Sequence, residues 1–85
     1  MLERKEESIH LSELSSNQVG VIASFSEALD PNTVQRLNDL GLHVDRNIQC
    51  LRRLPFGGPL SIAVDGLVLA LDNTVAKHIF VKSTN

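Results

Sequence analysis

Cysteine and histidine are the residues of this 85-residue sequence that could supply a nucleophile or a general base, and they are few and scattered. The single cysteine is Cys50, and the three histidines, His10, His43 and His78, stand alone. A nucleophilic centre would need Cys50 or a serine activated by one of these histidines. Cys50 lies within an apolar segment, where cysteine behaves as a small hydrophobic residue. We therefore predict that the chain is not an enzyme and has no catalytic residues.

Metal chemistry has one candidate grouping, Asp39, His43 and Asp45. Histidine together with carboxylates suits ferrous iron, but all three residues fall where polar surface turns are expected. The sequence contains no Cys-x-x-Cys pair and no histidine pair at helical spacing. We predict no metal site and no cofactor, and interpret the grouping as a solvated turn, although a weak site there stays open.

The sequence contains no recognisable motif for binding nucleotides or nucleic acids. No glycine-rich loop ends in Gly-Lys-Ser or Gly-Lys-Thr, and Gly57-Gly58 lies between prolines, which indicates a turn. The formal net charge of −2 argues against the positive field that nucleic acid or an anionic membrane would require. Four arginines form only a local basic patch, which we interpret as solvated surface: Arg36, Arg46, Arg52 and Arg53.

Length and composition predict one soluble domain. A chain of 85 residues with 42% apolar and 21% charged residues can bury one modest core. Residues 1–8 are mostly charged and are expected to form a frayed tail before a domain spanning 9–83. The absence of a leader peptide and of an internal disulfide predicts a cytoplasmic protein. The longest apolar run, Leu67 to Leu71, is too short for direct membrane insertion.

One helix is expected between two β segments. Val19 to Ser26 is rich in β-branched and aromatic residues and predicts a strand. Asp30 can cap a helix that has Pro31 in its first position and Gly41 as a left-handed end. Three apolar residues lie along one side of this helix: Val34, Leu37 and Leu40.

From Asn47 onward the apolar period is two, which predicts further short strands. The dipeptide Asp65-Gly66 between two alternating segments predicts a two-residue hairpin turn. A short helical turn follows, and the last strand covers Ile79 to Lys82. About five strands in so short a chain favour a mainly β, closed or nearly closed barrel. The residues expected to share one side of each strand are Ile48, Cys50 and Leu54; Leu60, Ile62 and Val64; and Leu67, Leu69 and Leu71, while Leu51 and Arg52 break the alternation.

Several motifs together resemble the FeoA family, the small accessory proteins of bacterial ferrous iron uptake. The resemblance runs from about Ile9 to Val81 and is most specific at residues 55–60. It implies an SH3-like β-barrel with one inserted helix, and a partner in FeoB, a membrane permease with a cytoplasmic G-protein domain. The motifs are Leu40-Gly41-Leu42, Ile48, Arg53-Leu54-Pro55-Phe56-Gly57-Gly58-Pro59-Leu60, Leu69-Ala70-Leu71 and Ala76-Lys77-His78-Ile79-Phe80-Val81.

Three positions depart from the family pattern. Asn17 and Asp45 stand where the family usually has glycine, and both residue types tolerate the left-handed region. Asp72 stands where many relatives have arginine, so no role is carried over to it. The alternative hypothesis is a metal-sensing or regulatory module, because similar barrels form the C-terminal domains of iron-dependent repressors. The absence of a helix-turn-helix before the expected barrel weighs against it.

The partner-docking surface is expected at two segments. Prolines on either side of a short loop restrict its backbone, and an aromatic side chain in such a loop is a typical hot spot. The alternative is that Phe56 folds back over the end of the barrel. A peptide groove for proline-rich ligands is not expected, since the sequence has no Trp or Tyr. The proposed docking residues are Leu40, Leu42, Pro55, Phe56, Gly57, Gly58 and Pro59.

Overall fold

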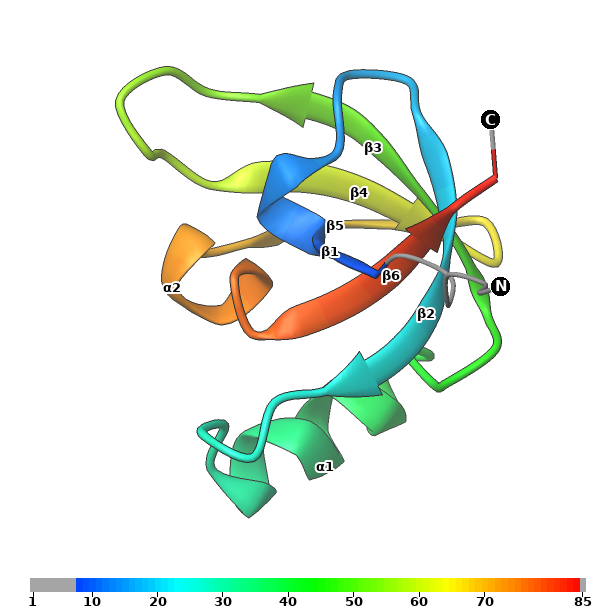
Figure 1. Ribbon diagram of the computed structural model, residues 1–85, viewed down its shortest axis with the longest axis vertical. Helices are drawn as coiled ribbons and strands as arrows, with labels where there is room; N and C mark the ends of the chain where they lie inside the picture. Colours follow the sequence, from blue (N-terminus) through cyan, green and yellow to red (C-terminus); the bar gives the residue numbers. More distant parts are fainter. Residues whose placement is uncertain (1–7, 85) are drawn as a thin grey trace, which may run out of the picture.

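An antiparallel sheet of six strands carries the fold, in the order β1-β6-β2-β3-β4-β5 (Figure 1). The structure is a computed structural model and describes residues 8–84. The expected tail therefore lies outside the described residues, except for the exposed Ser8. The elements are β1 Ile9–His10, the 3-10 helix η1 Leu11–Glu13, β2 Val19–Phe25, α1 Pro31–Asp39, β3 Asn47–Arg53, β4 Leu60–Val64, β5 Leu67–Leu71, α2 Asn73–Ala76 and β6 Ile79–Ser83.

The sheet bends around one apolar core, to which alternate residues of each strand contribute. In β4, Leu60, Ile62 and Val64 are at most 1% exposed, as the alternation predicts. The segment before β2 also contributes, because Leu11 and Leu14 are fully buried. The other buried core residues are Ile22, Leu37, Leu42, Ile48, Cys50, Leu71, Ala76, Ile79 and Val81.

Within residues 8–84, two β-bulges let the strands curve. The register of β2 against β6 shifts between Ile22 and Ser24, and that of β3 against β4 shifts between Cys50 and Arg52. A bulge bends its strand and increases the local twist. The second bulge is the reason why the alternation breaks at this point of the sequence. Leu54 lies just past the end of β3 and is 46% exposed, so the expectation that it shares a side of the strand with the buried Ile48 and Cys50 is wrong.

The mainly β, SH3-like architecture expected from the sequence is confirmed, with one more strand than expected. β1 has only two residues, and it is recognisable as a strand because it pairs with β6, about 70 residues away in the chain. Within residues 8–84 no ladder joins β1 to β5, so the barrel is nearly closed rather than closed.

The single inserted helix, α1, begins and ends where the sequence predicts. Pro31 takes the first position and Gly41 has a φ of 101° just past the end. Asp30 occupies the cap position, but its side chain accepts no cap hydrogen bond, so that detail of the prediction is wrong. Its carbonyl instead accepts from the N–H groups of Thr33 and Val34. No helix within residues 8–84 is long and apolar enough to cross a bilayer.

Left-handed residues make the tight turns of the barrel. Asn17 has a φ of 69° and Asp45 one of 75°, which confirms that both can replace glycine. In the β4–β5 hairpin Asp65 and Gly66 have φ values of 50° and 81°, the type I′ geometry expected for this dipeptide.

Candidate partner-docking site at the β3–β4 loop

The loop between β3 and β4 is an ordered extension of that hairpin. The N–H of Leu54 donates to the carbonyl of Pro59 at 3.4 Å, and that of Gly58 donates to the carbonyl of Pro55 at 3.3 Å. Between them, Phe56 and Gly57 have φ values of 62° and 73°. Two successive positive φ values inside such a hydrogen bond define a type I′ turn. The loop is therefore a short arm with a defined tip.

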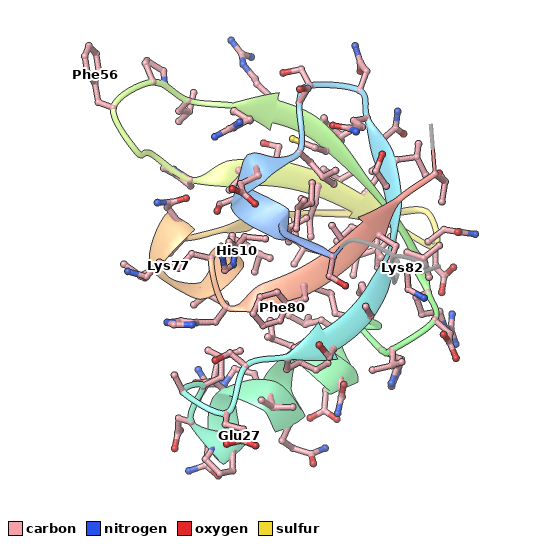
Figure 2. The ribbon with its side chains drawn as sticks, in the orientation of Figure 1. His10, Glu27, Phe56, Lys77, Phe80 and Lys82 are labelled. Atoms are coloured by element: carbon pink, nitrogen blue, oxygen red, sulfur yellow. The ribbon has the colours of Figure 1, made fainter. Side chains whose placement is uncertain are left out.

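Phe56 occupies the tip and points into solvent. Its relative exposure is 103%, and Figure 2 shows its ring directed away from the body of the protein. The alternative expectation, that Phe56 covers the end of the barrel, is wrong. A bulky residue in the left-handed region costs roughly 1 to 3 kcal/mol. The backbone conformation at position 56 thus favours Asn, Asp or Gly, yet the residue there is an exposed phenylalanine.

The two glycines of the loop serve different needs. A Cβ added at Gly57 would meet nothing within 4 Å, so only its positive φ favours glycine there. A Cβ at Gly58 would lie 2.9 Å from the Cβ of Leu54, which is too close for ordinary packing. Gly58 therefore allows the two arms of the loop to approach one another.

Two arginines stand at the base of the loop. Arg52 and Arg53 are both exposed, and Arg53 donates through Nη1 to the carbonyl of Leu14 at 3.3 Å. Within residues 8–84, neither guanidinium has an acidic partner. The β3–β4 loop thus combines an apolar tip with a positively charged base, a surface complementary to an apolar pocket with acidic residues at its rim.

The segment after α1, residues 40–42, does not form one continuous surface with the β3–β4 loop. Leu42 is fully buried in the core, which removes it from any docking surface. Leu40 is 43% exposed, but it adjoins Gly41, which packs near Val64 at the far end of β4 from the loop. The length of β4 separates the two segments by about 13 Å. Figure 1 shows them at opposite ends of the barrel.

No arrangement for nucleophilic or metal chemistry emerges within residues 8–84. Cys50 is fully buried, and this burial raises the pKa of its thiol, an effect that the Arg53 guanidinium only partly offsets. No three His, Cys, Asp or Glu side chains of the described chain are placed to hold a metal ion. His43 and Asp45 are exposed, and the carboxylate of Asp39 accepts from Gln35 at 3.1 Å.

Two other features are not evident from sequence patterns. The ring of His10 packs against that of Phe80 (Figure 2), with centroids 5.0 Å apart, and its buried Nδ1 has no hydrogen-bond partner among residues 8–84. A shallow hollow of about 260 Å³ lies on the outer face of β2, β3 and β4. Its carboxylate, Asp65, forms an ion pair with Arg46 and is not free for acid or base chemistry.

A family model decides the assignment, because that of the FeoA domain matches residues 9–83. The chain belongs to the FeoA family. It is 30% identical to the FeoA protein of Chlorobium tepidum, with 91% of this chain and 71% of that one covered and a TM-score of 0.82. It is 26% identical to the zinc-complexed FeoA of Stenotrophomonas maltophilia, described as a prokaryotic SH3 domain protein, with 87% and 89% covered and a TM-score of 0.75.

The FeoA fold is also found in a larger regulator. The chain is 26% identical to a manganese-dependent transcriptional repressor, with 94% of this chain and 44% of that one covered and a TM-score of 0.84. Curated protein sequences give no significant match. Family membership therefore supports an accessory role in iron transport, while the fold alone does not distinguish transport from regulation.

Proposed function

We propose that this chain is a non-catalytic, cytoplasmic accessory protein of ferrous iron uptake that binds the cytoplasmic portion of a FeoB-type permease. Membership of the FeoA family supports the pathway. The observation that carries the docking step is Phe56, a fully exposed aromatic residue held at a φ of 62°. Backbone strain of this kind is typical of functional positions.

The β3–β4 loop has the properties of a binding hot spot. Its hydrogen-bonded turn and two prolines fix the backbone before binding, which reduces the entropy lost on association. The ring of Phe56 would insert into an apolar pocket of the permease, and Arg52 and Arg53 would lie at the rim. Rim charges chiefly raise the association rate, so we expect binding to be faster at low salt.

The substitution Phe56→Asn tests the proposal, because it separates binding from folding. Asparagine favours the first central position of a type I′ turn, so the variant should be more stable than the parent by about 1 kcal/mol. Its affinity for the isolated cytoplasmic portion of the permease should fall by more than about tenfold, or 1.4 kcal/mol. Calorimetric titration gives the affinity, and urea unfolding gives the stability.

Phe56→Trp is the matched control, since it keeps an aromatic ring in the same backbone conformation. We expect it to bind within about threefold of the parent. Normal binding by Phe56→Asn would show that the loop is not the docking site. An absence of binding by the unsubstituted chain would contradict the proposed function itself.

A regulatory module is the second candidate, favoured by the manganese-dependent repressor that shares this fold. A module that senses metal would need a stoichiometric metal site, whereas the accessory role does not. Metal titration of the purified chain therefore distinguishes the two functions.

A further inference from the structure

The strand β5 is an open edge of the sheet. It pairs with β4 and with no other strand of the described chain. All of its residues, Leu67 to Leu71, are apolar, yet Val68 is 62% exposed and Ala70 is also exposed on the outer face. On the inner face Leu67 is 44% exposed. The opposite edge strand, β1, has only two residues, so β5 is the longer and more exposed of the two edges.

The backbone of β5 presents unused hydrogen-bonding groups at this edge. Val64 and Leu67 flank a two-residue turn and therefore form a hydrogen-bonded pair. The alternation of antiparallel ladders then directs the N–H and C=O groups of Val68 and Ala70 away from β4. These two donors and two acceptors, at alternate residues, are the groups that an added strand would bond.

Edge strands usually carry sequence features that prevent pairing with other chains, and β5 lacks the common ones. Charged residues, proline and bulges are the common devices. The run from Leu67 to Leu71 contains no charge, proline or glycine, and its register against β4 is continuous. Such an edge is a template for strand addition.

The charges around β5 indicate what it would bind. Asp65, before the strand, forms an ion pair with Arg46. Asp72, after the strand, is exposed, and its side chain has no cap hydrogen bond and no ion-pair partner among residues 8–84. Among the described residues, an unpaired carboxylate thus lies at the C-terminal end of the open edge.

We propose that the β5 edge binds an extended apolar segment of another protein, as an added antiparallel strand preceded by a basic residue. Antiparallel pairing brings the N-terminal flank of the incoming segment beside Asp72. A second copy of this chain fits less well. Pairing of two β5 strands about Leu69 would bring Asp72 of each copy close to Asp65 of the other. This inference is independent of the proposed docking to a permease.

Amide hydrogen exchange of the full chain tests the site directly. The probe is a capped peptide of two lysines followed by three Val-Thr repeats, and a second peptide has glutamates in place of the lysines. We expect the lysine peptide to slow exchange at Val68 and Ala70 by about tenfold or more, and to bind about fivefold more tightly than the glutamate peptide. Unchanged exchange at both amides would overturn the proposal.

Two substitutions define the contacts. Ala70→Pro removes one donor from the open edge and leaves the ladder with β4 intact, whereas the control Ala70→Ser keeps the N–H. The first should weaken peptide binding by about tenfold and the second by less than about twofold. Asp72→Asn should abolish the preference for lysine over glutamate, a result that does not depend on the folding of Ala70→Pro. Binding unaffected by Ala70→Pro, or protection of the edge by dimerisation without peptide, would contradict the inference.

Discussion

Single residues at positive φ show which positions serve folding and which do not. Among residues 8–84, four residues other than glycine have positive φ: Asn17, Asp45, Phe56 and Asp65. Asparagine and aspartate enter the left-handed region at low cost, so three of these positions need no further explanation. Phe56 is the exception, because it is bulky and its exposed ring has no intramolecular contact to offset the strain. This contrast is why Phe56, rather than any polar residue, is the basis of the proposed function.

A prediction at the scale of one residue concerns Cys50. Burial raises the pKa of its thiol, so the folded state holds this proton at pH values where the unfolded chain has released it. The associated stability is fully present below about pH 8.5 and decreases as the pH rises from there towards the raised pKa. The free energy of unfolding should therefore fall more steeply above pH 8.5 in the parent than in Cys50→Ala. Urea unfolding between pH 7 and 10 measures this free energy for both proteins. Equal slopes of the free energy of unfolding against pH would contradict the prediction.

At the scale of elements, the β4–β5 hairpin links a local sequence signal to the proposed strand-binding edge. Asp65 and Gly66 make the type I′ turn, and the turn fixes which backbone groups of β5 face outward. A one-residue change of register would exchange the bonded and open groups and reverse the faces of the strand. The turn therefore controls both the packing of Leu71 in the core and the direction of the N–H of Ala70.

The substitution Gly66→Val tests the strength of this turn. A Cβ at position 66 would meet nothing within 4 Å, so the only penalty is the φ of 81°. Valine should lower the free energy of unfolding by roughly 1 to 3 kcal/mol. Gly66→Asn is the matched control, since asparagine tolerates positive φ, and it should cost less than about 1 kcal/mol. Equal denaturation midpoints for the two variants would show that the turn does not limit stability.

At the scale of the whole molecule, a feature could be predicted from the sequence when the residues that determine it are close together in the chain. Alternation and turn residues are local, and they predicted β4, β5 and the turn at Asp65-Gly66. The pairing of β1 with β6 depends on contacts remote in sequence, so a two-residue strand gave no local signal. The docking prediction combined Leu42 with Phe56, although Leu42 is a core residue near the far end of β4 from the loop. Only the folded arrangement reveals that separation.

The last prediction concerns ferrous iron and the whole chain. Asp39, His43 and Asp45 are near one another in sequence, but no three potential ligands within residues 8–84 converge on one point. Anaerobic calorimetry of the full chain with ferrous iron should detect nothing tighter than roughly micromolar, about −8 kcal/mol. His43→Ala and the control His78→Ala should titrate like the parent. A stoichiometric site lost only in His43→Ala would contradict this prediction and favour the regulatory function, because a sensor needs a resident site that an accessory docking protein does not.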